Sequence, residues 1–471
     1  MAIKIYNSLS KRKERLPVSF KKKLNLFACG PTVYDYLHIG NARTNAFFDT
    51  LARFLRSENY KLFYLQNITD IDDKIINRAF KQKTGWKKLA NKFETIFRGN
   101  MQSLNITSVD KYANATKFIP QIARQIKILI EKGHAYEIKN DGYYFDIKTF
   151  KDYGKLSGRT IKQAEDGVSR IDNSKNKKNA GDFCLWKFSR GGEPSWNTTL
   201  GKGRPGWHIE DTAISEEFFG PQYHLHGAGV DLKFPHHEAE IAQQESISGK
   251  KPFVRIWMHV GMLTAKGGKK MSKSLNNFIT INEYLKKHSP NSFRIWVAGN
   301  HYRSPMEISE KSILDSEKKI YSIQEFISKL NFRIKSKRNI GNPRKINTKS
   351  YSDEFISAMS DDINTPKAMA AIFMLINDVN NYIWNLKPAQ AKNLKKMLCQ
   401  KLEILGVFPE IHKIPKRITA LLRQRELFRS NKQFIKSDAL RKKINALGYK
   451  VEDTPIGPLA LREFTTENTK S

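Results

Sequence analysis

Two separated groups of residues have the types and order needed to hold a phosphate chain. Residues 38–41 read His-Ile-Gly-Asn and follow a short apolar run, so an imidazole stands where a helix begins. Backbone N–H groups and the dipole at a helix start favour phosphate, and Gly40 leaves room for a ligand. Residues 270–274 read Lys-Met-Ser-Lys-Ser after two glycines, so Lys270 and Lys273 can neutralise charge on departing pyrophosphate. Alone, the segments read as a helix-start histidine and a solvated basic loop; together they predict a split nucleotide site.

A second group has the types and spacing of metal ligands. Pro235 suits the first position of a helix, which puts His236 and Glu240 four residues apart on one helical face. Cys29 ends an apolar run and can supply a thiolate, and Asp211 offers a further anion. Sulfur, imidazole and carboxylate are ligands that zinc accepts. Singly, Cys29 reads as core filler and His236 as a helix cap, whereas their conjunction favours a metal.

Length and charge restrict the class of protein that carries these groups. A chain of 471 residues exceeds what one hydrophobic core normally organises, so two or more domains are expected. Lys and Arg number 82 against 46 Asp and Glu, which gives a net charge of +36. Such an excess favours nucleic acid as the partner, and the alternative is a lysine-rich composition without a binding role.

Other features of the composition place the chain in the cytoplasm and away from membranes. Three cysteines are too few for a disulfide framework and indicate a reducing compartment. The N-terminus lacks the apolar stretch of a signal peptide. The apolar run over 368–376 is far shorter than the ~20 residues that span a bilayer. A content of 39% hydrophobic residues is enough for folded cores.

The elements that must position these groups alternate between strands and helices. Apolar runs and helical periodicity predict a strand, a helix and a strand over 24–29, 45–56 and 62–65, and again over 222–226, from 235, and over 253–259. Units of this kind build a doubly wound parallel sheet, whose ligands lie at the carboxyl ends of its strands. The fold class is therefore α/β with a Rossmann-type catalytic domain.

The remaining segments differ in character from this sheet. Residues 120–200 are rich in turns and basic residues and predict an inserted subdomain with an exposed loop over 172–179. Long amphipathic segments over 313–330 and 368–386 predict an α-helical region. The basic, Asn-rich stretch 335–349 is interpreted as a linker.

With both phosphate-binding segments in this order, the chain resembles a class I aminoacyl-tRNA synthetase. Four further segments narrow the resemblance to the cysteinyl-tRNA synthetase family, namely residues 27–35, 67–74, 203–210 and 234–240, and a C-terminal match reaches 453–455. The resemblance implies a cysteine–tRNA ligase that activates L-cysteine with ATP and transfers it to the 3′-terminal adenosine of tRNA(Cys). It also implies Mg²⁺ with ATP, one Zn²⁺ per chain and a monomer.

The resemblance assigns roles to individual residues. The catalytic residues are His38, Asn41, Lys270 and Lys273; the ATP-binding residues are Gly40, His226, Gly227, Gly229, Asp231 and Lys273; the cysteine-binding residues are Thr69 and Trp207; the metal ligands are Cys29, Asp211, His236 and Glu240; the anticodon-binding residues are Arg429, Phe434, Asp438 and Asp453. Cations such as Arg425 beside Phe434 would suit phosphates and an unpaired base. The alternative for this C-terminal segment is a plain amphipathic helix.

Some positions depart from the family pattern. Asp211 stands where the family usually has a second cysteine ligand, and it keeps the same single negative charge while offering oxygen in place of sulfur. Ala228 stands where glycine is usual. His224 and His226 offer imidazoles that could also serve a metal.

The expected domains follow the segments in chain order. They are two halves of the catalytic domain at 1–119 and 201–275, a connective insertion at 120–200, a stem-contact region at 276–334, a linker and helical domain at 335–405 and an anticodon-binding domain at 406–471. Two alternative functions remain open. One is a ligase that joins cysteine to an amino sugar, and the other is an RNA-binding paralogue without catalysis.

Overall fold

The computed structural model describes residues 2–19, 21–160, 163, 174, 176–265, 267, 278–336, 338 and 346–464. The chain forms two compact units: unit 1 comprises 1–282 and 302–307, and unit 2 comprises 283–301 and 308–471. Lys270 and Lys273 lie outside the described residues. No helix in the described part of the chain is both long and apolar enough to cross a membrane.

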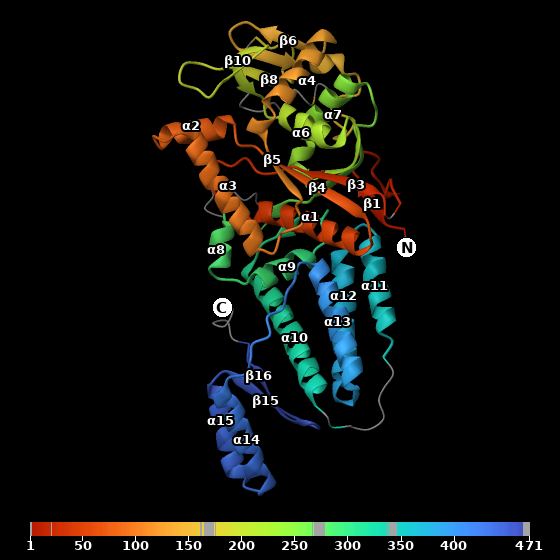
Figure 1. Cartoon of the computed structure of the whole chain (residues 1–471), viewed down its shortest axis with the longest axis vertical. Coiled ribbons are helices and arrows are strands. Elements are labelled where there is room, and N and C mark those ends of the chain that lie inside the picture. The colour runs from red at the N-terminus through yellow and green to blue at the C-terminus, as the bar shows by residue number, and fades with distance from the viewer. Residues whose placement is uncertain are drawn as a thin grey trace. The chain divides into compact units, whose positions relative to one another are not determined.

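Unit 1 is built on a five-stranded parallel sheet. The order is β12-β11-β3-β4-β5, with bounds β3 (Lys23–Ala28), β4 (Lys61–Ile68), β5 (Lys111–Asn114), β11 (Tyr223–Gly229) and β12 (Val254–Val260). Five of the six residues of β3 are buried, as expected for a strand covered on both faces. Helix α1 (Ile39–Ser57) covers one face, and α4 (Ile119–Glu131), α6 (Ile209–Phe219) and α7 (His236–Ser248) lie on the other (Figure 1). The predicted doubly wound sheet is confirmed.

The predicted insertion contains a sheet of its own. Five antiparallel strands run in the order β6-β7-β8-β10-β9, namely β6 (Ala135–Ile138), β7 (Gly142–Phe145), β8 (Phe183–Phe188), β9 (Trp196–Thr198) and β10 (Gly201–Pro205). The chain leaves β10 and passes within a few residues into α6. The insertion therefore delivers Trp207 and Asp211 to the parallel sheet.

The remaining elements of unit 1 are short, apart from one helical hairpin. They are β1 (Lys4–Asn7), β2 (Arg12–Arg15), α2 (Asp73–Lys81), α3 (Trp86–Ser103), η1 (Ala115–Lys117), η2 (Ile147–Thr149), η3 (Val230–Lys233), β13 (Leu263–Thr264) and β14 (Met306–Glu307). Helices α2 and α3 form a hairpin between β4 and β5 that stands out from the rest of unit 1 (Figure 1).

Unit 2 consists of helices followed by a small mixed region. The helices are α9 (Pro290–Ala298), α10 (Glu310–Lys335), α11 (Thr348–Ser360), α12 (Thr365–Asn380) and α13 (Pro388–Ile404), with η6 (Ile383–Asn385) after α12; α8 (Ile281–Leu285) lies at the boundary of the units. The predicted helical region is confirmed. Then follow α14 (Lys416–Ser430), α15 (Phe434–Ala446) and the antiparallel pair β15 (Tyr449–Thr454) and β16 (Gly457–Arg462). Ile418, Leu422, Ile444 and Val451 belong to the core of this last part.

Candidate functional site

The four predicted metal ligands come together at the carboxyl end of β3. Cys29 follows β3, Asp211 lies in the first turn of α6, and His236 and Glu240 lie one turn apart on α7. One ligand atom from each lies within 4.8 Å of those of the other three. His236 Nε2 is 3.0 Å from Asp211 Oδ2 and 2.9 Å from Glu240 Oε1. Elements far apart in the sequence thus converge on one group, called the outer set below.

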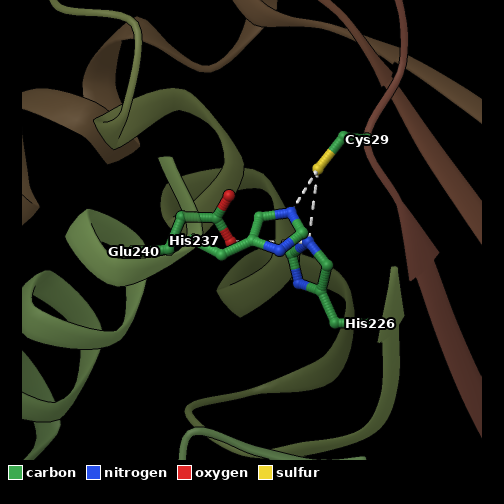
Figure 2. Close-up of side chains that lie close together, drawn as sticks. All are labelled: Cys29, His226, His237 and Glu240. Carbon is green, nitrogen blue, oxygen red and sulfur yellow. Dashed lines mark hydrogen bonds and ion pairs between the residues drawn. The ribbon is translucent and has the colours of Figure 1, made fainter. Parts of the chain in front are cut away.

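Two further histidines complete a second group around the same thiol. Cys29 Sγ lies 3.3 Å from His226 Nε2 and 3.1 Å from His237 Nε2, and Figure 2 shows the thiol directed at both rings. Cys29, His226, His237 and Glu240 again place one ligand atom each within 4.8 Å of the others. This inner set shares Cys29 and Glu240 with the outer set.

The inner set arises from strand pairing and helix docking. Strand β11 is parallel to β3, and the Cys29 N–H donates to the Gly227 carbonyl at 3.0 Å, which brings the residue before Gly227 beside the thiol. His226 was expected near the adenosine, but its Nε2 faces Cys29 and its Nδ1 contacts the Tyr223 hydroxyl. Sequence reasoning assigned no role to His237. The available signal was the adjacent pair of histidines at the start of a predicted helix.

Burial controls the charges in both sets. Burial raises the pKa of the Cys29 thiol well above its usual value, and the nearby carboxyl groups of Glu240 and Asp211 raise it further. Burial also raises the pKa of Glu240, to about 7, against the opposing effect of His236. For His236, burial disfavours the cation, but the two carboxylates prevail and raise its pKa to about 10. Burial therefore favours the neutral forms of the Cys29 thiol and of Glu240 until a cation offsets their charge, while His236 is held as an imidazolium.

The donor atoms of the outer set fit a cation. Glu240 is fully buried, and neither of its carboxylate oxygens accepts a hydrogen bond from a described residue, nor does Asp211 Oδ1. His236 Nε2 is close to Glu240 Oε1, but its hydrogen bond goes to Asp211. Buried carboxylate oxygens without donors are costly, and a bound metal ion removes that cost. Sulfur, imidazole and two carboxylates are an acceptable zinc set.

Neighbouring side chains fix the orientation of the His236 ring. Its Nδ1 lies 2.8 Å from His208 Nδ1, and the Trp207 ring stacks on it with centroids 4.4 Å apart and planes at 16°. Such contacts to the second ring nitrogen hold a ligating imidazole in one orientation. Trp207, predicted to bind the amino acid, therefore lies directly against a candidate metal ligand.

The other predicted amino-acid residue, Thr69, is also buried beside this group. Its hydroxyl donates to Glu210 Oε2 at 2.9 Å, and burial and the neighbouring Asp211 raise the pKa of Glu210 well above its usual value. Trp207 also lines a cavity of about 150 Å³ together with Asp72, Lys74 and Arg204. Trp207 thus contacts a candidate metal ligand directly, and Thr69 contacts Glu210, the residue before Asp211.

The predicted nucleotide residues gather at the start of α1 and the end of β11. His38 caps α1: its Nδ1 accepts the Gly40 N–H at 3.0 Å, and the Asn41 side chain accepts the His38 N–H at 3.3 Å. A Cβ added at Gly40 would lie 2.7 Å from the His38 ring, so glycine allows the imidazole to fold over the helix start. The ring orientation is therefore set by the cap.

The end of β11 packs closely against α1 because Gly227 has no side chain there. A Cβ added at Gly227 would come within 2.1 Å of the Phe48 ring of α1. Gly229 follows two residues later, and Asp231 lies exposed in η3. The structure thus places the glycines beside the helix that His38 caps.

The predicted anticodon residues lie in the last part of unit 2. Arg429 Nη1 is 2.6 Å from Asp453 Oδ2, and both residues are exposed. Phe434, at the first turn of α15, is 59% exposed, and Asp438 is exposed one turn further along. Arg425, expected as a phosphate-binding cation, is instead buried and makes two bonds to Asp453, at 2.6 and 2.9 Å. The positive charge of Arg425 is therefore neutralised by Asp453 within the protein.

Comparisons with known proteins agree with this architecture. A family model described as the tRNA synthetases class I (C) catalytic domain matches residues 16–318, and a DALR domain model matches 354–409. Among solved structures, a methionyl-tRNA synthetase of Mycobacterium tuberculosis shares the fold, with a TM-score of 0.59 and 14% identity over 82% of this chain and 90% of that one. The fold is that of a class I synthetase.

Curated relatives narrow the class. A protein of Thermoplasma volcanium named cysteine–tRNA ligase is 41% identical over 95% of this chain and 97% of its own length. One of Coxiella burnetii with the same name is 38% identical over 97% and 99%. The chain belongs to the cysteine–tRNA ligase family, which confirms the resemblance drawn from the sequence motifs.

Proposed function

We propose that this chain is a cysteine–tRNA ligase, which activates L-cysteine with ATP and transfers it to the 3′-terminal adenosine of tRNA(Cys). The observation that carries the proposal is the outer set at the end of β3, next to the strand whose glycines face the His38-capped helix. Relatives with this name match along nearly their whole length. A thiol-binding group and a phosphate-binding helix start therefore serve one catalytic domain.

In the first step, the cysteine carboxylate attacks the α-phosphorus of ATP. A carboxylate O–P bond forms as the bond from that phosphorus to pyrophosphate breaks, which yields cysteinyl-adenylate. Catalysis needs no protein nucleophile and consists of positioning and charge stabilisation. His38 contacts the phosphates at the positive end of the α1 dipole, and Asn41 maintains the cap that orients His38. Lys270 and Lys273 neutralise pyrophosphate, and Mg²⁺, when bound with ATP, would supply further positive charge there.

The ATP and cysteine contacts follow from the same elements. Gly40, Gly227 and Gly229 let the nucleotide approach the backbone, and Asp231 accepts hydrogen bonds from ribose hydroxyls. His226 is assigned to the ATP site as well, although its ring contacts Cys29 of the candidate metal site. Thr69 and Trp207 border the amino acid, and Trp207 is held in place by its stacking on His236.

Zinc is assigned to Cys29, Asp211, His236 and Glu240. When bound, the ion would accept the substrate thiolate, and a serine hydroxyl ionises far less readily, so cysteine would be selected. The buried carboxylate oxygens without donors support this assignment. His208 and Trp207 keep the His236 ring in place for it.

The last part of unit 2 is assigned to the anticodon. Phe434 offers an exposed ring on which an unpaired base can stack. Arg429 and Asp438 present a cation and a hydrogen-bond acceptor, and Asp453 holds Arg429 in position through their 2.6 Å contact. The transfer step then brings the ribose hydroxyl of the terminal adenosine to the adenylate and releases AMP.

The test begins with cysteine-dependent ATP–pyrophosphate exchange by the full chain and continues with charging of tRNA(Cys). We expect exchange with cysteine and not with serine, and stable cysteinyl-tRNA. Lys273→Ala should lower exchange at least about 100-fold, whereas Lys286→Ala, which alters an exposed lysine outside the signature, should not. Exchange without tRNA charging would favour an amino-sugar ligase, and tRNA binding without exchange a non-catalytic paralogue.

A further inference from the structure

The α2–α3 hairpin carries an unusual concentration of positive charge. Residues 74–93 contain seven Lys and Arg and no Asp or Glu. Four of these cations, Lys81, Lys83, Lys87 and Lys88, cluster at the tip and are exposed. Their ammonium groups have no carboxylate partner among the residues that the structure describes. Such a run of exposed lysines creates a local positive potential that attracts a polyanion.

Not every cation of the hairpin is available to a ligand. Arg78 lies 2.5 Å from Asp35 and stacks over the Phe93 ring at 4.8 Å. Arg78 is therefore part of the packing between the hairpin and the sheet. The four tip lysines contrast with it, because they contribute nothing to that packing.

An aromatic side chain stands beside these lysines. Phe80, in the last turn of α2, is 84% exposed, although Ile75 and Ala79 on the same helix are buried. A single exposed ring among cations is the combination that stacks an unpaired base while lysines contact the adjoining phosphates. A membrane-binding helix would need a continuous exposed apolar face, and the apolar residues Ile75 and Ala79 are turned inward.

The hairpin tip is held in a defined position. The Lys83 N–H donates to the Phe80 carbonyl at 3.1 Å, and the Thr84 N–H donates to the Ala79 carbonyl at 3.0 Å. Trp86, the first residue of α3, meets Trp196 of β9 edge to face at 5.9 Å. The tip is thus braced against the inserted sheet, and a rigid surface loses less entropy when it binds.

The base of the hairpin leads to the cavity that Trp207 lines. Asp72 caps α2, and Asp73 at its start is 2.5 Å from Arg204 of β10. Lys74, Lys187 and Arg204 all line the cavity. Asp72 and Asp73 line it as well, and Arg204 and Lys187 are ion-paired with Asp73 and Asp141. Helix α2 therefore joins the exposed lysines of the tip to a cavity wall of mixed charge.

We propose that the α2–α3 hairpin is an RNA-binding surface of the catalytic unit, which guides the acceptor end of the tRNA toward the cavity beside Trp207. Lys81, Lys83, Lys87 and Lys88 contact phosphates, and Phe80 stacks on a base. The identity of the RNA as tRNA rests on the proposed function. The surface is separate from the anticodon residues and acts in the transfer of cysteine, not in its activation.

The experiment compares two full-length variants of equal charge change. One replaces the four tip lysines with glutamine, and the control replaces Lys22, Lys23, Lys61 and Lys111, exposed lysines at the amino ends of β3, β4 and β5. The tip variant should raise the KM for tRNA at least about tenfold and make the slope of log affinity against log salt shallower by about three. Cysteine-dependent exchange without tRNA should stay within about twofold, which also shows that the variant folds.

The aromatic contribution is tested at Phe80 separately. Phe80→Ala should raise the KM for tRNA about tenfold, and Phe80→Trp should restore it, because either ring can stack a base. An unchanged KM and salt slope in the tip variant would overturn the proposal. It would also be overturned if the tip variant lost binding to phosphatidylserine vesicles while its tRNA kinetics stayed intact, because the lysines would then serve a membrane surface. Failure of the proposed function would look different, since the unaltered chain would then not catalyse exchange at all.

Discussion

The metal group of unit 1 and the Arg425–Asp453 pair of unit 2 both set carboxylates against nitrogen-bearing side chains, with opposite outcomes. In unit 2, Asp453 accepts hydrogen bonds from Arg425 and Arg429 at 2.6 to 2.9 Å, and its side chain keeps 38% exposure. In unit 1, Glu240 is fully buried and its oxygens accept none from the described residues. One carboxylate is satisfied by the protein, and the other is not.

This difference separates a structural ion pair from a candidate metal site. Asp453 has a lowered pKa, chiefly because Arg425 donates to it. Glu240 has a raised pKa, chiefly because it is buried. In the described part of the chain, Glu240 has only the nearby His236 ring to compensate its charge, at 2.9 Å, and a buried acid with a raised pKa of this kind is typical of a functional site. The contrast predicts that substitutions in unit 1 change metal binding, and those in unit 2 change local stability.

The largest effect is expected from Glu240→Gln. The substitution removes a charged ligand shared by both sets, so the zinc content of the purified chain should fall from about one equivalent to below about a tenth. Cysteine-dependent exchange should fall at least about 100-fold, since changes even in residues behind the ligands cost 10–100-fold. Atomic absorption of the purified protein measures the metal.

A matched glutamate on the same helix provides the control. Glu238 is also buried, but it accepts the Leu156 N–H at 2.7 Å and the Ser157 hydroxyl at 3.1 Å. Glu238→Gln should therefore keep its zinc. Equal zinc content in Glu240→Gln and Glu238→Gln would remove the basis of the comparison between the two regions.

A smaller effect is expected at Asp211, where the two sets differ. Asp211→Cys supplies a second thiolate and should tighten zinc binding about tenfold, and Asp211→Asn should weaken it by a similar factor. His237→Asn should change it less, because His237 belongs only to the inner set. Competition with a chromophoric chelator gives the dissociation constants. A larger loss with His237→Asn than with Asp211→Asn would assign the ion to the inner set.

The sequence was sufficient for four strands of the parallel sheet, though not for β5, and for the grouping of the outer set. Buried parallel strands are short apolar runs, so β3, β4, β11 and β12 were visible as such. His236 and Glu240 were linked by helical spacing alone. Cys29 was added to this pair because it ends a predicted strand, and Asp211 because it occupies a ligand position of the family.

The rest depended on packing that no local pattern encodes. His237 follows His236 by about 100° around α7, and only the docking of α7 on β11 shows that this direction reaches Cys29. Helix α14 is polar on most of its surface, so its sequence does not reveal that Arg425 points inward. The antiparallel sheet of the insertion was likewise hidden by short strands between turns.

In unit 2, the two arginines should differ in their effect on stability. Arg425→Ala removes two hydrogen bonds to Asp453 and the packing of a buried side chain, and should lower the free energy of local unfolding by about 2 kcal/mol. Arg429 is exposed, so Arg429→Ala should cost only about 0.5 kcal/mol. Hydrogen exchange of the β15 and β16 amides in the full chain measures both. Equal costs would show that burial does not govern this pair.

The smallest effect is a pH dependence of the same pair. Arg425 holds the pKa of Asp453 below its usual value, so the pairing is fully stabilising above the unfolded-state pKa of about 3.9. The stabilisation is lost as the pH falls through the lower folded-state value. Because the carboxylate is 38% exposed, solvent limits the contribution to under about 1 kcal/mol. Hydrogen exchange of β15 between pH 6 and pH 3 should show this loss for the unaltered chain and not for Asp453→Asn. Identical pH profiles would mean that the arginines stabilise β15 by packing alone. The Asp453 carboxylate would then be dispensable, in contrast to the Glu240 carboxylate, which we expect to be required for zinc binding.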